Sequence, residues 1–279
     1  MKPQEEIWVK RFPWIIQFYY LYLCAASVMD IAYWTERYPI VEYRGLLALV
    51  HFGWPVLDLI LTLCLMTQWV GILFWRHRSV RIAITIATLF QLSVYWSCVN
   101  PSSGHNWNGR DLLSLMSILL ALISTRTLVT GDRLKLYSIA WCCRALLAST
   151  YFLSGLNKVL SGVAFSGQHT VTAFFLLQPL TDYYMPTDGI LTPYLLRHEV
   201  LNALWLHLLT LTMLWTPFAL RRRKTSLIWA VVMLIFHLGN ALTLSIFYTH
   251  HFALIFLFFI FLDLEDYSFE ETSNERAVT

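Results

Sequence analysis

The stretch from Leu136 to Leu160 reads LYSIAWCCRALLASTYFLSGLNKVL, and it decides the fold class of this chain. A helix needs about 20 mostly apolar residues to cross the hydrocarbon core of a bilayer. This stretch exceeds that length, and its only charged side chains are Arg144 and Lys158. The sequence therefore predicts a membrane-spanning helix here.

The composition of the whole chain agrees with this prediction. Hydrophobic residues make up 57% of the 279 positions and charged residues 13%, which leaves too little polar surface for a soluble protein. Aromatic residues make up 16%, which suits helix ends that anchor in two membrane interfaces. A soluble enzyme, a secreted disulfide scaffold and a disordered chain are excluded. The net charge of +3, without a basic stripe, also argues against nucleic acid, so the predicted partner is the lipid bilayer.

Eight apolar stretches predict an all-α, polytopic membrane helical bundle of about eight spans. Residues 1–262 are expected to form the membrane domain, and residues 263–279 an acidic cytoplasmic tail. Pro55 is expected to kink the second stretch or to split off its first turn. The eighth stretch is short for a span and equally fits a bent or interfacial segment. The stretches are Phe12 to Trp34, Leu46 to Trp75, Ile82 to Val99, Leu112 to Thr130, Leu136 to Leu160, Val200 to Leu220, Ser226 to Tyr248 and Phe252 to Leu262.

The basic residues predict the orientation, because cytoplasmic connections are enriched in Lys and Arg. With the N-terminus in the cytoplasm, fourteen of the 20 basic residues fall on the inner side, and both termini are cytoplasmic. We expect a multi-pass protein of the cell membrane, most simply a bacterial inner membrane. The inner residues are Lys2, Lys10, Arg11, Arg76, Arg78, Arg81, Arg126, Arg133, Lys135, Arg221, Arg222, Arg223, Lys224 and Arg276.

Two segments have a second interpretation. A cleaved signal peptide would fit Lys10, Arg11 and the small residues that follow the first apolar run, but its removal would leave seven spans and spoil the charge alternation. The outer connection, residues 161–199, is long and contains three prolines. Long connections are usually functional or contain elements of their own. We interpret this one as a re-entrant or interfacial segment between spans five and six, and as a candidate lid.

Ionisable residues inside a span mark either a functional site or a buried pair that fixes packing. Arg144, Tyr151 and Lys158 are spaced by seven and share one side of a helix. His237 and Asn240 share a face of the seventh span. Both interpretations stay open for each residue, and the same holds for Asp30, Asp58 and His207. The five cysteines have neither CxxC spacing nor nearby His pairs, so we expect buried free thiols and no metal site.

Three motifs resemble the horizontally transferred transmembrane domain family, which includes the membrane domain of vitamin K-dependent gamma-carboxylase. They are YFLSGLNK at Tyr151 to Lys158, the run FHLGNALTLSI at Phe236 to Ile246, and the Asn/Trp loop at Asn100 to Asp111. The resemblance covers nearly the whole chain in order.

The resemblance implies that Lys158 is a base that deprotonates a reduced, vitamin K-like quinone, and the predicted topology places its pocket at the outer leaflet. We expect His237 as a second catalytic residue, because a neutral imidazole on an otherwise apolar helix face can orient a polar ligand or shuttle a proton. Where the carboxylase has the motif Trp-Asn-Asn-His, this chain has Trp-Asn-Gly-Arg. Its last residue, Arg110, stands in place of the histidine and cannot accept a proton near neutral pH. The expected ligand-binding residues are Tyr151, Asn240, Arg110, Asn108 and Trp107.

Protein-glutamate carboxylation by this chain alone is not expected, because the chain lacks the large extramembrane domain of the carboxylase. We therefore expect an enzyme that acts on a quinone or another lipid-soluble substrate. The alternative is a non-enzymatic membrane factor that assists maturation or export of a secreted peptide, as in the sporulation-delaying protein B type. A transporter ranks last, because paired broken helices are absent from the predicted spans.

Overall fold

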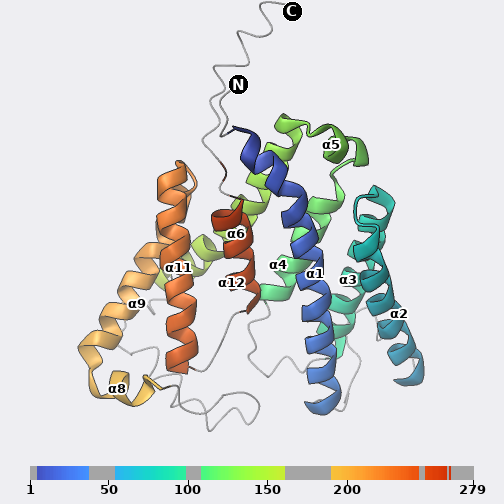
Figure 1. Cartoon of the computed structure of the whole chain (residues 1–279). Coiled ribbons are helices and arrows are strands. Elements are labelled where there is room, and N and C mark those ends of the chain that lie inside the picture. Colours follow the sequence, from blue (N-terminus) through green and yellow to red (C-terminus); the bar gives the residue numbers. More distant parts are fainter. Residues whose placement is uncertain are drawn as a thin grey trace, which may run out of the picture.

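The computed structural model describes residues 5–37, 54–98, 108–160, 190–244, 249–262 and 264, and its regular elements are all helical (Figure 1). The all-α prediction is confirmed for this part of the chain. The elements are α1 (Glu5–Arg37), α2 (Trp54–Leu73), α3 (Arg78–Cys98), α4 (Asn108–Ala121), α5 (Thr125–Thr130), α6 (Arg133–Leu160), α8 (Thr192–Arg197), α9 (Glu199–Leu214), α10 (Thr216–Ala219), α11 (Arg223–Leu244), α12 (Thr249–Ile255) and the π-helix η4 (Phe256–Phe261).

Three helical segments in the described residues are long and apolar enough to cross a membrane: Ile7–Met29, Arg133–Leu160 and Arg223–Leu242. Shorter apolar helices accompany them in α2, α4, α9 and α12 with η4. Large apolar side chains also point outward from the bundle, among them Ile86 and Leu208. Such a surface is costly in water and is normal where lipid surrounds a helix, so the protein is compatible with membrane insertion.

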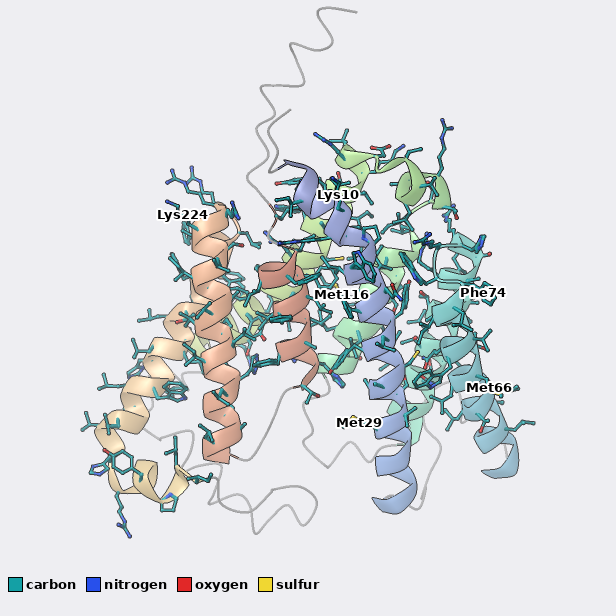
Figure 2. The ribbon with its side chains drawn as sticks, viewed as in Figure 1. Lys10, Met29, Met66, Phe74, Met116 and Lys224 are labelled. Atoms are coloured by element: carbon teal, nitrogen blue, oxygen red, sulfur yellow. The ribbon has the colours of Figure 1, made fainter. Side chains whose placement is uncertain are left out.

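Consecutive long helices run in opposite directions (Figure 1). In the view shown, α1, α3, α6 and α11 run downward, and α2, α4, α9 and α12 with η4 run upward. The start of α1, the turn after α2, the helix α5 and the start of α11 therefore lie at one end of the bundle. Lys10 and Lys224 mark this basic end, and Met29 lies toward the opposite end (Figure 2).

The last apolar segment, α12 with η4, occupies the centre of the bundle. It packs against α1, α4, α6 and α11, and Leu254, Ile255 and Phe258 are fully buried. A helix that packs against several neighbours is apolar on most of its surface, which explains why the run Phe252 to Leu262 has no polar face; Phe256 is its exposed position, at 46%. The segment is therefore a largely buried helix of the core.

The π-turn in η4 leaves a backbone carbonyl available to a buried arginine. Leu262 donates its N–H to the Leu257 carbonyl at 3.0 Å, one residue further back than in an α-helix. Arg144 donates from Nε to the Phe258 carbonyl at 2.7 Å, and its guanidinium lies 5.1 Å from the centre of the Phe259 ring. Arg144 therefore fixes α6 to the central helix, which is a packing role.

Two predicted spans end earlier than expected, because local signals break the helices. The stretch Leu112 to Thr130 divides after Ala121, and Ser124 caps the new helix α5 by accepting the Thr127 N–H at 3.0 Å. The stretch Val200 to Leu220 divides at Trp215, where Pro217 follows in the first turn of α10. Pro55 lies in the first turn of α2, where proline is tolerated, and so it produces no kink inside the described helix.

Asp132 directly precedes α6 and lies outside the membrane-length segment. Its carboxylate accepts the Lys135 N–H at 3.3 Å and pairs with the Lys135 ammonium at 2.9 Å. This hydrogen bonding to Lys135 holds the pKa of the Asp132 carboxyl below its usual value. The pair marks the solvated edge of the basic end.

Arg81 joins the ends of two helices at the basic end. Its guanidinium is fully buried and donates to the carbonyls of Trp75 and Arg76, both at 2.8 Å, just after α2. It also donates to Leu120 in the last turn of α4, at 3.2 Å, and to Ile123. Helix C-termini carry partial negative charge, so one cation stabilises both. The sequence predicts Arg81 as one of the cytoplasmic basic residues, but it does not predict that the side chain is buried.

Candidate functional site

Tyr151 of α6 and His237 of α11 meet inside the bundle. The Tyr151 hydroxyl and His237 Nε2 are 2.5 Å apart, and the two side chains are only 3% and 2% exposed. Both residues were predicted as site residues, and the structure brings them into direct contact. A hydroxyl and an imidazole together provide a donor and an acceptor in an otherwise apolar region.

A third polar ring comes from the central helix. The His251 ring lies 5.6 Å from the Tyr151 ring and 5.7 Å from the His237 ring, measured between centroids. The Trp229 ring packs edge-on against Tyr151 at 5.4 Å. We call Tyr151, His237 and His251 the tyrosine–histidine cluster; its members come from three helices, α6, α11 and α12.

Helical spacing explains how α6 and α11 supply these residues. Arg144 and Tyr151 are two turns apart and are both buried on the face of α6 that meets the centre of the bundle. On α11, Asn240 follows His237 by three residues and is also buried. The predicted shared faces are therefore confirmed for these residues. The spacing of residues along each helix does not predict that the two faces meet; their assignment to one ligand pocket does.

Lys158 lies further along α6. Seven residues separate it from Tyr151, which is a rise of about 10 Å along the helix axis. Its Nζ donates to the Ser154 hydroxyl at 2.8 Å, and the side chain is half-buried. At Gly155 an added Cβ would lie only 2.7 Å from Met213 Cβ, so glycine permits the close approach of α9 beside this end of α6.

The predicted loop residues are described only in part. Trp107 lies outside the described residues. Asn108 and Arg110 belong to the first turn of α4, but their side chains are not described. Residues 161–189 of the predicted lid and the tail beyond Leu264 also lie outside the described part. After them, Leu191 donates its N–H to the Leu242 carbonyl at 3.0 Å, which ties the start of α8 to the end of α11.

Two residues of the site were not predicted from the sequence. His251 joins the cluster, and its neighbour His250 accepts or donates through Nδ1 to the Tyr22 hydroxyl of α1 at 2.7 Å. Adjacent positions on a helix point about 100° apart, so His250 and His251 reach different neighbours of α12, which are α1 for His250 and α6 with α11 for His251. The sequence feature that could have indicated these two residues is a pair of histidines directly before an apolar run.

The other polar and sulfur-containing residues that the sequence analysis named are not members of the tyrosine–histidine cluster. His207 points outward from α9. The side chains of Asp30, Asp58 and Cys98 are not described. Among the described cysteines all are free thiols; Cys24, Cys64 and Cys143 are buried, and Cys142 is exposed, contrary to the expectation that all are buried. Within the described residues no group of three His, Cys, Asp or Glu side chains could hold a metal ion.

The described residues define an all-helical protein with membrane-length helices and a buried cluster of one tyrosine and two histidines. Comparisons with models of known families, with curated proteins and with solved structures find no match.

Proposed function

We propose that this chain is a multi-pass membrane protein of the horizontally transferred transmembrane domain family that binds a quinone or a similar lipid-soluble ring compound. The observation that carries the proposal is the buried hydrogen bond between Tyr151 and His237, 2.5 Å long. Ionisable side chains are rare inside membrane bundles and often belong to sites.

The chemistry of the cluster fits a planar ring that carries oxygen atoms. The hydroxyl of Tyr151 and the imidazoles of His237 and His251 can donate to or accept from a ring oxygen. The rings of Trp229 and Phe236 supply apolar contacts next to Tyr151 and His237. A reduced quinone supplies an acidic hydroxyl, and Lys158 receives its proton as a general base. Asn240, Asn108, Arg110 and Trp107 complete the proposed ligand contacts.

We further propose that the chain crosses the membrane eight times with both termini in the cytoplasm, as in a bacterial inner membrane. Two features support this topology. Consecutive long helices alternate in direction, and the basic connections before α3, around α5 and before α11 lie at one end of the bundle, whereas Arg197 of α8 lies at the other end. The opposite end then faces the outer leaflet, toward which α6 carries Lys158.

Cysteine labelling tests the topology. Single cysteines replace Ile190, which is 83% exposed at the start of the α8 segment, and Ser79, which is exposed in the first turn of α3 at the basic end. The native cysteines are removed beforehand. We expect an impermeant maleimide added to intact cells to label the cysteine at position 190 and to spare position 79. Labelling of position 79 from outside would contradict the topology.

Native purification tests the function. We expect mass spectrometry of the gently solubilised protein to find a quinone at close to one molecule per chain, and His237→Leu to remove most of it, since that variant keeps an apolar side chain but loses the bond to Tyr151. Leu238→Ala, on the exposed side of the same helix, is the matched control. A co-purified peptide in place of a quinone would contradict the proposal and favour a peptide-maturation factor.

A further inference from the structure

An exposed histidine lies in the middle of α9. His207 has eight residues of this helix before it and seven after it, and its side chain is exposed between the exposed leucines Leu204 and Leu211. Within the described residues, its imidazole takes part in no hydrogen bond or ring contact. Ionisable side chains of membrane helices normally face the interior of a bundle or pair with another polar group. In a single copy of the chain, His207 does neither.

Hydroxyl groups elsewhere on the apolar helices are satisfied within their own helix. Thr67 and Ser93 donate to the carbonyls four residues earlier at 2.8 and 2.9 Å. Thr212, on α9 itself, donates in the same way to the Leu208 carbonyl at 2.8 Å. These side chains can face lipid without a further partner, whereas the imidazole of His207 needs one.

His207 belongs to an exposed stripe that has the spacing of a helix-pairing seam. Val200, Leu204, His207 and Leu211 follow each other at intervals of four, three and four residues, and the three apolar members are 73%, 49% and 62% exposed. An average repeat of 3.5 residues is the one by which two helices pack along each other. The helix α9 lies at the edge of the bundle (Figure 1). Its buried face is a different one and consists of Leu206, Thr210 and Met213.

A second copy of the chain is the partner that this stripe fits. A neutral imidazole carries one N–H donor and one acceptor nitrogen, so two histidines complement each other. Copies inserted in the same orientation are related by a two-fold axis along the membrane normal, and this symmetry places each residue of the stripe opposite its own counterpart. Because His207 lies at the middle of α9, it meets its counterpart even where the two helices cross at an angle.

We propose that two copies of the protein associate in the membrane through the exposed stripe of α9, and that their two His207 side chains form a hydrogen bond at the centre of the interface. A single polar side chain in an apolar seam fixes the register and the number of helices. The interface is separate from the tyrosine–histidine cluster of α6, α11 and α12, and it does not depend on the proposed function.

Oxidative cross-linking in native membranes tests the interface. Leu211→Cys and Met66→Cys are introduced separately after removal of the native cysteines. Both positions are about equally exposed, at 62% and 60%, and Met66 lies on α2 at the opposite edge of the bundle (Figure 2). A disulfide needs two Cα atoms within about 7 Å. We expect most chains with Leu211→Cys to form linked dimers and those with Met66→Cys to stay single. Equal cross-linking at the two positions, or links from position 211 to a different protein, would overturn the proposal.

Dimer dissociation in a bilayer tests the histidine. Single-molecule photobleaching of the labelled protein, diluted stepwise in vesicles of phosphatidylethanolamine and phosphatidylglycerol, gives the dissociation constant of the dimer. We expect His207→Leu to raise this constant about fivefold or more, because the variant loses the hydrogen bond between the helices. His207→Gln keeps a donor and an acceptor, and we expect it to stay within about twofold of the wild type. Monomeric wild-type protein, or an unchanged constant in His207→Leu, would overturn the proposal.

Discussion

Arg81→Leu is expected to lower the free energy of unfolding by about 3 kcal/mol or more. The substitution removes the donors that satisfy the carbonyls of Trp75, Arg76, Leu120 and Ile123, all of which follow or end a helix. Leaving buried carbonyls without donors costs about 1–3 kcal/mol for each group that finds no other partner. Denaturant unfolding of the purified protein in detergent measures the loss.

Two further substitutions show whether the loss of stability is specific to the guanidinium of Arg81. Arg81→Lys keeps the charge but not the planar fork, so we expect it to recover only part of the lost stability. Arg78→Leu, three residues earlier and exposed, removes the same charge from the same end and is expected to change stability by less than about 0.5 kcal/mol. If Arg81→Leu were as mild as Arg78→Leu, the joining role of Arg81 would be wrong.

The second large effect is expected at Lys158. Under the proposed function, Lys158→Ala removes the general base that deprotonates a reduced naphthoquinone for its oxidation by O2, and we expect the rate of oxygen uptake to fall about 100-fold or more. The protein is expected to stay folded, because the half-buried lysine bonds locally to Ser154. An oxygen electrode measures the rate, and Lys135→Ala at the other end of α6 is the matched control.

Tyr151→Phe separates binding from proton transfer. The variant keeps the ring that packs against Trp229 and loses only the hydroxyl that bonds to His237. A lost hydrogen bond of about 1 kcal/mol predicts a rise of several-fold in the KM for the quinone, with a smaller change in kcat. A wild-type rate in folded Lys158→Ala would remove the assignment of the base, whatever Tyr151→Phe shows.

Periodicity in the sequence was enough to predict the class of the fold and two faces of the site. The spacing of Arg144 and Tyr151 predicts one buried face of α6, and the spacing of His237 and Asn240 predicts one of α11; both faces are buried. Helix ends were less predictable, because the cap at Ser124 and the turn at Trp215 interrupt stretches that hydropathy alone treats as continuous.

The sequence pattern did not predict which distant segments contact each other. His251 was missed because a hydropathy pattern treats the pair His250 and His251 as the edge of an apolar run. The burial of Arg81 was missed because a basic residue beside Arg76 and Arg78 looks like a loop charge. In each case the decisive partner lies on another helix, and the spacing of residues along one helix carries no information about it.

Photolabelling shows whether a quinone binds at the tyrosine–histidine cluster. A naphthoquinone that carries a diazirine is illuminated with the protein in native membranes, and the modified peptides are sequenced by mass spectrometry. We expect labels on α6, α11 and α12 within reach of Tyr151, His237 and His251, and their loss when unlabelled quinone is in excess. Labels confined to outward-facing positions such as Ile86 and Leu208, unaffected by competitor, would contradict it.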